Sequence, residues 1–133
     1  HKEEHKILKI GFSDDVISAA KLLFSEKAED VYVINVSHLT IVADYFILAS
    51  GRSDVHVKSL CDEISKYMND KGYKMLRMEG YREGRWIVID YGDILVHIFH
   101  KREREFYGLE RLWVDGNNYR VITDADMEAG APQ

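Results

Sequence analysis

A single cysteine and the lack of any long apolar run set the first limits on this 133-residue chain. Cys61 has no second cysteine to bridge, which excludes an internal disulfide and fits a reducing compartment. No run approaches the roughly 20 apolar residues that a membrane-spanning helix needs. Glu3 and Glu4 lie in a polar start with no apolar stretch behind it, so we expect no signal peptide and a cytoplasmic protein without membrane contact.

Clustered positive charge is also missing. The net charge is −5, but residues 31–120 contain 13 acidic and 13 Lys or Arg residues, so the acidic excess lies in the terminal segments. Proteins that bind nucleic acid draw much of their affinity from concentrated basic surface. The neutral body favours a protein partner or a small ligand over direct, specific recognition of nucleic acid.

What the chain does contain is the composition of an ordinary folded domain. Hydrophobic residues make up 46% and charged residues 31%, and the length suits one core without disulfide support. We predict a single domain over 1–133, with a body at about 14–119. The segments 1–12 and 120–133 show no periodicity and are expected to be loose.

Apolar periodicity and turn residues divide the body into alternating elements. We predict helices over 14–27, between Ser53 and Gly72, and over 106–113, and strands over 31–36, 45–49, 74–78, 85–90 and 93–99. The strands at 45–49 and 74–78 flank a helix, so they should run parallel. The fold class is therefore α+β, with a single mixed β-sheet of about five strands and packed helices.

The last two predicted strands form a hairpin. Only Tyr91 and Gly92 separate them, and this spacing predicts a two-residue turn. An antiparallel register through that turn pairs Asp90 with Asp93 and places alternate residues on one face. The predicted face consists of Trp86, Val88, Asp90, Asp93, Leu95 and His97. The opposite face is aliphatic and belongs in the core.

Two interpretations of this face follow. An aromatic anchor with polar groups at its rim is typical of a protein-binding surface, and a basic partner would relieve two opposed carboxylates. Alternatively, a helix covers Trp86, and Asp90 and Asp93 are solvated turn residues. The hairpin pattern alone is compatible with both.

Patterns for metal binding and nucleophilic catalysis are weak. His97 and His100 are three apart on a strand, so they point to opposite faces and cannot share a metal. Cys61 lies on the apolar face of the second helix, where a lone cysteine is usually a small buried hydrophobe. We therefore expect no metal, no cofactor and no catalytic residue.

Phosphate chemistry is also poorly supported. A nucleotidyltransferase needs two carboxylates that reach the same metal ion, as residues two apart on a strand do. Asp90 and Asp93 are three apart across a turn, and the Asp-x-Asp of residues 124–126 lies in the expected tail. The Gly51-Arg52-Ser53 turn could hold an anion at the start of a helix, although an ordinary capped turn is the simpler interpretation.

Several short blocks occur together and in order along the chain: Ala43-Asp44-Tyr45-Phe46, Ala49-Ser50-Gly51 with Ser53, Glu79-Gly80, Trp86, Asp90-Tyr91-Gly92-Asp93, Val96-His97 and Phe106-Tyr107 through Leu109-Glu110 to Leu112-Trp113. In these blocks the chain resembles the ribosomal silencing factor family, also called the Iojap family. The resemblance covers about Asp30 to Trp113.

The resemblance implies a nucleotidyltransferase-like α+β sheet without the catalytic carboxylates. It also implies a non-enzymatic protein that binds the large ribosomal subunit through ribosomal protein fourteen, blocks association with the small subunit and represses translation. Carried over to this chain, the partner-binding candidates are Trp86, Asp90, Tyr91, Asp93, Ile94, His97, Tyr107 and Glu110.

Two other functions stay open beside this one. The first is a residual nucleotide-binding or nucleotidyltransferase-like protein, with phosphate held by the turn at Gly51. The second is a dimeric adaptor that buries the same hairpin face against a partner. We expect the chain to be a monomer or a weak homodimer.

Overall fold

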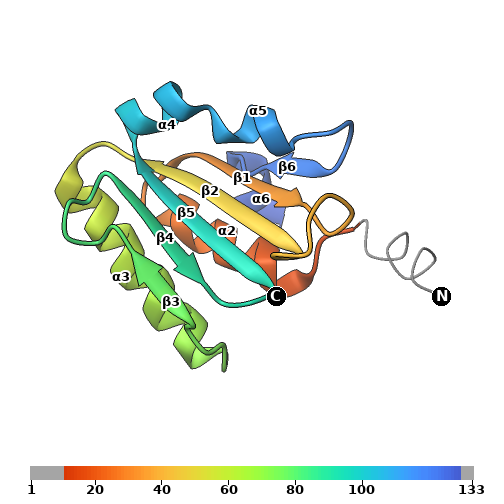
Figure 1. The fold of residues 1–133 in the computed structure, drawn as a ribbon, viewed down its shortest axis with the longest axis horizontal. Helices are drawn as coiled ribbons and strands as arrows, with labels where there is room; N and C mark the ends of the chain where they lie inside the picture. Colours follow the sequence, from red (N-terminus) through yellow and green to blue (C-terminus); the bar gives the residue numbers. More distant parts are fainter. Residues whose placement is uncertain (1–10, 130–133) are drawn as a thin grey trace.

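The computed structural model describes residues 11–129. Its elements are α2 (Asp14–Ser25), β1 (Glu29–Asn35), β2 (Tyr45–Gly51), α3 (Asp54–Asp70), β3 (Arg77–Glu79), β4 (Trp86–Asp90), β5 (Ile94–His100), α4 (Lys101–Tyr107), α5 (Leu109–Trp113), β6 (Tyr119–Val121) and α6 (Asp124–Ala129). Figure 1 shows the sheet with α2 and α3 behind it and with α4 and α5 along one side of its front.

The two long helices start where serine caps predict. Ser13 Oγ accepts a hydrogen bond from Val16 N at 3.2 Å, and Asp14 and Asp15 occupy the first turn of α2. In α3, Ser53 Oγ accepts from His56 N at 3.1 Å. These caps satisfy backbone donors that the helix leaves unpaired, and the acidic side chains favour the positive end of the helix dipole.

The sheet has six strands in the order β3-β4-β5-β2-β1-β6. β2 and β5 pair in parallel, and every other neighbouring pair is antiparallel. The predicted α+β fold with one mixed sheet is confirmed, with one strand more than the five expected. β2 and β3 run in the same direction as predicted, but β4 and β5 lie between them.

The additional strand comes from the segment that was expected to be loose. β6 pairs with β1, Ile122 is buried behind it, and α6 follows. Asp126 stabilises the start of α6 by accepting hydrogen bonds from Thr123 N and Arg120 Nη2, both at 2.7 Å. The loose segment predicted after Tyr119 is therefore wrong for 120–129, because so short a strand has no periodicity to detect. The parts of the predicted loose ends at 1–10 and 130–133 lie outside the described residues.

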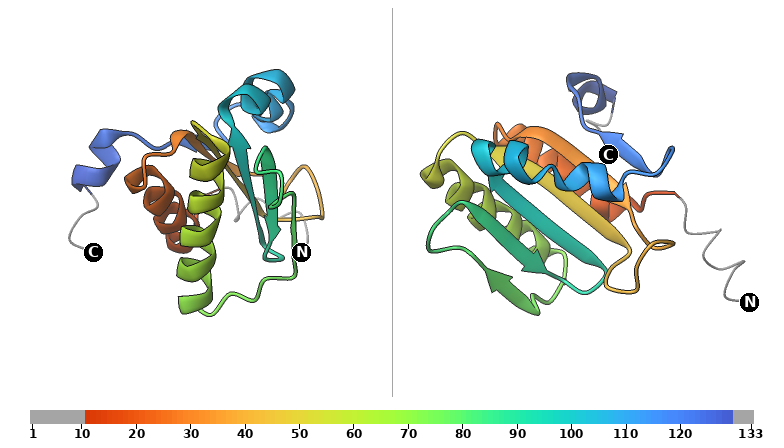
Figure 2. Two further views of the ribbon diagram at one scale, coloured as in Figure 1. Left: turned by 90° about the vertical axis from the view of Figure 1, so that its left-hand side faces the viewer. Right: turned by 45° about the horizontal axis from the view of Figure 1, so that its top comes forward.

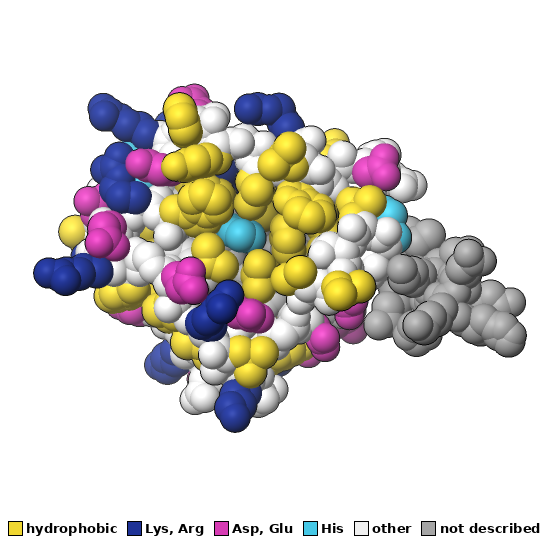
Figure 3. Space-filling model, viewed as in Figure 1, with side chains coloured by type: hydrophobic (Ala, Val, Ile, Leu, Met, Phe, Trp, Pro, Cys, Tyr) yellow, Lys and Arg dark blue, Asp and Glu magenta, His cyan; other side chains and the backbone are white. Residues whose placement is uncertain are grey.

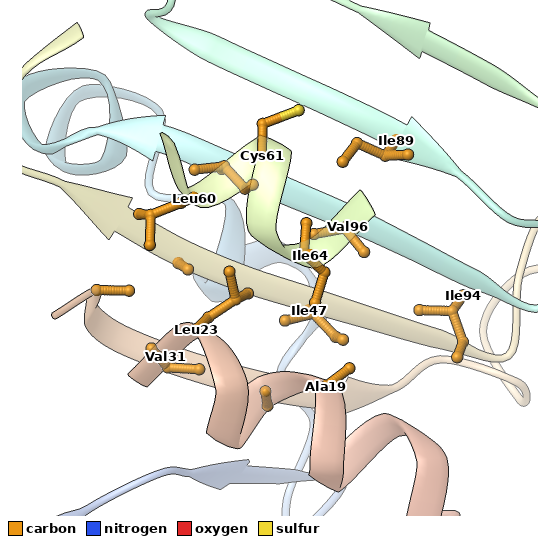
Figure 4. Close-up of a cluster of buried hydrophobic side chains, with 14 of the residues drawn as sticks. Ala19, Leu23, Val31, Ile47, Leu60, Cys61, Ile64, Ile89, Ile94 and Val96 are labelled. Atoms are coloured by element: carbon orange, nitrogen blue, oxygen red, sulfur yellow. The ribbon is translucent and has the colours of Figure 1, made fainter. Parts of the chain in front are cut away.

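The main core lies between the sheet and the pair α2 and α3. Figure 4 shows side chains of both helices meeting aliphatic side chains of β1, β2, β4 and β5. The labelled members are Ala19, Leu23, Val31, Ile47, Leu60, Cys61, Ile64, Ile89, Ile94 and Val96. Within residues 11–129, no helix is both long and apolar enough to cross a membrane.

The opposite side of the sheet is only partly covered. One helix was predicted over 106–113, but helical structure begins at Lys101 and divides into α4 and α5. Gly108 causes the break, because its φ of +52° is left-handed and continues neither helix. Figure 2 shows α4 and α5 on the side of the sheet away from α2 and α3, leaving much of that side without a helix.

Candidate functional site

We call the side of the sheet away from α2 and α3 the open face, because α4 and α5 cover only part of it. The strand registers place on it alternate residues of three neighbouring strands, which are Phe46 and Leu48 of β2, Trp86, Val88 and Asp90 of β4, and Leu95, His97 and Phe99 of β5. Figure 3 shows apolar side chains gathered over these strands and against α4 and α5. A contiguous apolar surface of this kind is typical of an interaction site.

The β4–β5 hairpin forms with a register different from the predicted one. Tyr91 N donates to Ile94 O, so the two-residue turn is Gly92-Asp93, with Gly92 at φ +88°. Trp86 then pairs with Phe99, Val88 with His97, and Asp90 with Leu95. The pairing shift is an even number of residues, so each side chain stays on its predicted face. Asp93 leaves the paired region, and the predicted Asp90–Asp93 pair is wrong.

Trp86 lies in an aromatic cluster at the α4 side of the open face. Its ring is stacked on Phe99 at a centroid distance of 4.8 Å and lies 4.8 Å from the ring of Tyr107 at the end of α4. The side chain is half-buried. Tyr107 of α4 and Phe99 of β5 therefore cover part of the indole, and the remainder is accessible to solvent.

His97 is the polar centre of the open face. Its Nδ1 accepts a hydrogen bond from Trp86 Nε1 at 3.2 Å, while Nε2 has no partner among the described residues. Burial lowers the pKa of His97 to about 4, and the positive charge of Arg104 acts in the same direction. The imidazole is therefore neutral near pH 7, with its proton on Nε2, and it is buried among the aromatic and apolar side chains of the open face.

The two aspartates have different positions. Asp90 is half-buried on the open face, and its Oδ1 accepts from Gly92 N at 2.8 Å, which fixes the hairpin turn. Asp93 is exposed at the tip. Burial and the Asp15 carboxylate raise the pKa of Tyr73, a residue packed on the α2 and α3 side, and the charge of Asp93 adds to this effect. Asp93 therefore lies at the boundary between the two sides of the sheet.

Tyr91 and Ile94 do not join the open face. Both belong to the main core, where their exposed fractions are 7% and 2%. The Tyr91 ring meets Tyr73 edge-on at 6.3 Å. The structure gives these two candidates a packing role behind the hairpin.

Tyr107 and Glu110, the candidates on α4 and α5, have different surroundings. Tyr107 is exposed and extends the open face beyond Trp86. Glu110 Oε1 instead accepts from Arg104 Nε at 3.0 Å, and Arg104, which is buried, also donates to Ser50 Oγ. Glu110 thus holds α5 to α4 and the sheet.

The structure gives no support for a reactive thiol at Cys61 or for an anion site at the Gly51 turn. Cys61 is fully buried, as predicted, and burial raises the pKa of its thiol to about 11, so the reactive thiolate is suppressed. At the Gly51 turn, Ser53 caps α3, and His56 Nδ1 accepts from Arg52 N, so these backbone donors are already engaged. No group of three or more His, Cys, Asp or Glu side chains within 11–129 is placed to hold a metal ion.

The sequence interpretation missed the exposed apolar residues at the two ends of the open face. On the β1–β2 loop, residues 36–44, Leu39, Ile41 and Val42 are exposed. At the other end Phe106 is exposed and meets Tyr107 edge-on at 4.9 Å. Three apolar residues in four positions of a turn were a detectable signal, because turns usually carry polar residues.

Comparison with known proteins gives consistent relatives. The family described as "Ribosomal silencing factor during starvation" matches residues 11–132. A Bacillus subtilis protein named Ribosomal silencing factor RsfS is 40% identical over 97 residues, covering 73% of this chain and 82% of that protein. A mouse protein named Mitochondrial assembly of ribosomal large subunit protein 1 is 30% identical over 107 residues, covering 78% of this chain and 47% of the mouse protein.

Solved structures show the same fold. A crystal structure of a Chromobacterium violaceum protein matches with a TM-score of 0.71 and 30% sequence identity, over 77% of this chain and 87% of that one. A Bacillus halodurans protein matches with a TM-score of 0.68 and 35% identity, over 77% of this chain and 99% of that one.

Proposed function

The chain belongs to the ribosomal silencing factor family, and on that basis we propose that it represses translation by binding the large ribosomal subunit and blocking association with the small one. The proposed contact is ribosomal protein fourteen, and the proposed compartment is the cytoplasm. The action is binding rather than catalysis.

The open face is the observation that carries this proposal. It presents Trp86, stacked on Phe99 and flanked by Tyr107, on a side of the sheet that α4 and α5 cover only in part. Large aromatic side chains in such a setting supply most of the binding energy of protein interfaces. Asp90 and Asp93 at the hairpin end offer acceptors for a basic surface, as ribosomal proteins commonly present.

Steric exclusion requires no chemical step. A folded domain bound where the two subunits meet prevents them from joining, and the block is as complete as the occupancy of the site. The effect should therefore be stoichiometric and saturable. An enzyme would act at amounts far below those of the ribosome.

Sedimentation of separated subunits tests the function. The protein is titrated from below to above the subunit concentration, at fixed magnesium and salt, and the joined particle is resolved on a sucrose gradient. We expect the protein to comigrate with the large subunit and the joined peak to fall in proportion to occupancy. Normal joining with the protein left at the top of the gradient would contradict the proposal.

A further inference from the structure

The most exposed large apolar side chain in the described part of the chain is Ile41, on the β1–β2 loop. Its exposed fraction is 99%, and the neighbouring Val42 is also exposed. A completely exposed isoleucine contributes nothing to the core of its own fold. It gains stabilisation only when another surface covers it.

The loop is held in place rather than free. Leu39 N and Thr40 N both donate to Val36 O, Val42 N donates to Thr40 Oγ1, and Asp44 N donates to Asp93 O at the hairpin tip. Val36 and Ala43, at the two ends of the loop, are buried in the apolar cluster beneath α4 and α5. Ile41 is therefore presented on an ordered turn, which lowers the entropy cost of binding through it.

The loop lies on the same side of the sheet as the open face. Figure 2 shows it projecting away from α2 and α3, on the side where α4 and α5 lie. Ala43 and Phe46 share one buried cluster with Trp86 and Leu95 at its margin, so the end of the loop is packed against the open face.

The charges around the loop indicate what the partner carries. Residues 36–51 contain no Lys or Arg. The exposed carboxylate of Asp93 adjoins one end of the loop, and Asp115, whose side chain is 70% exposed, lies 4.0 Å from His38 at the other. An apolar residue between carboxylates fits a basic protein surface with an aliphatic hollow, whereas the phosphates of RNA would be repelled.

We propose that Ile41 is a second anchor of the docking surface and inserts into an aliphatic hollow framed by Lys or Arg side chains on the large-subunit protein. This inference rests on the proposed function. It adds a contact at the opposite end of the open face from Tyr107, so two separated anchors fix the orientation of the bound domain. Val42 packs beside Ile41 in the same contact.

Binding to purified large subunits, measured by cosedimentation, tests the proposal with matched variants. Ile41→Ser should weaken binding about tenfold or more, because it removes a side chain that the complex buries. Val55→Ser is the control, since Val55 is a comparably exposed aliphatic residue at the start of α3. The control should bind as the wild type does, and both variants should keep the wild-type melting temperature.

Charge at the same position tests the nature of the partner. Ile41→Lys should bind more weakly than Ile41→Asp, because a basic rim repels the added cation, and the difference should shrink at high salt. Equal binding by Ile41→Ser and the wild type would overturn the second anchor while leaving the proposed function intact. Sedimentation velocity shows whether Ile41→Ser dissociates a homodimer. If the variant does so and still binds large subunits normally, the second anchor is overturned as well. A wild type that binds no large subunits would overturn both proposals together.

Discussion

Trp86 Nε1 donates a hydrogen bond to His97 Nδ1 across β4 and β5, at 3.2 Å. The pair joins the main aromatic side chain of the open face to its buried polar centre. Because Nδ1 must be unprotonated to accept, the bond fixes a neutral imidazole with its proton on Nε2. Protonation of His97 Nδ1 would therefore break this contact within the open face.

Burial of His97, with a smaller effect from Arg104, makes the stability depend on pH. In the unfolded chain His97 binds a proton near pH 6.5, but in the folded protein only near 4. Between these values the unfolded state binds more protons, so the free energy of unfolding falls as the pH is lowered. At about 1.4 kcal/mol per pH unit, His97 accounts for a loss of up to about 3 kcal/mol.

Urea unfolding followed by circular dichroism at several pH values between about 7 and 4 measures this loss. The control is His97→Asn, which keeps an acceptor near Nδ1 but does not titrate. Other titrating groups lower the free energy of unfolding equally in both proteins. The difference in free energy of unfolding between the wild type and His97→Asn should therefore narrow as the pH falls. A difference that stays constant across this range would contradict the depressed pKa.

Gly80 positions the strand that carries Trp86. Its φ is +85°, and an added Cβ would collide with the carbonyl oxygen of Trp86. Gly80→Ala should therefore destabilise the protein by clearly more than the roughly 1 kcal/mol that a left-handed alanine costs alone. Gly116→Ala is the matched control, because Gly116 has φ +75° with nothing within 4 Å of its Cβ position. Thermal denaturation measures the stability of both variants. Equal decreases in stability for Gly80→Ala and Gly116→Ala would disprove the steric argument.

Glu110 is expected to matter for stability rather than for docking. It pairs with Arg104, which is buried, so Glu110→Gln leaves a buried charge poorly compensated and should cost about 2 to 3 kcal/mol. Asp126→Asn, which breaks the more exposed pair with Arg120, should cost roughly 1 kcal/mol. Chemical denaturation compares the two. A Glu110 variant that unfolds like the wild type but no longer binds subunits would restore Glu110 as a docking residue.

The charge at the hairpin tip predicts a salt-dependent effect. Asp93 is exposed and its side chain forms no ion pair with the described residues, so Asp93→Lys should leave folding unchanged. Reversing its charge should weaken binding to large subunits by several-fold at low salt and less at high salt. Cosedimentation at two salt concentrations measures both. Weakening that does not depend on salt would argue against a basic partner at this end.

The sequence was sufficient to predict which residues face which side of the hairpin, because alternation along a strand survives an even shift in register. It was not sufficient for the register itself. Gly92 could stand second in a turn with Tyr91 or first in a turn with Asp93, and backbone contacts of Asp93 with Asp44 and Tyr45 favour the second. Those contacts lie nearly fifty residues apart in sequence, beyond any local pattern.

Burial separates the candidate residues in a way that motif positions could not. Tyr91 and Ile94 flank the turn, next to open-face residues in sequence, yet their side chains lie in the core. Glu110 looks like an exposed helical carboxylate until Arg104 is seen buried against it. Ile41 shows the reverse, since an apolar residue in a connector suggests packing and proves fully exposed.

Docking through the open face is tested most directly by the affinities of the wild type and of Trp86→Ala for purified large ribosomal subunits. Val88→Lys, at a half-buried position of the open face, serves as a second variant in case the first is unstable. Circular dichroism establishes that each is folded. We predict a loss of at least about 30-fold for Trp86→Ala and a comparable loss for Val88→Lys, as expected at the centre of an interface. Wild-type affinity in folded forms of both variants would show that the open face is not the docking surface.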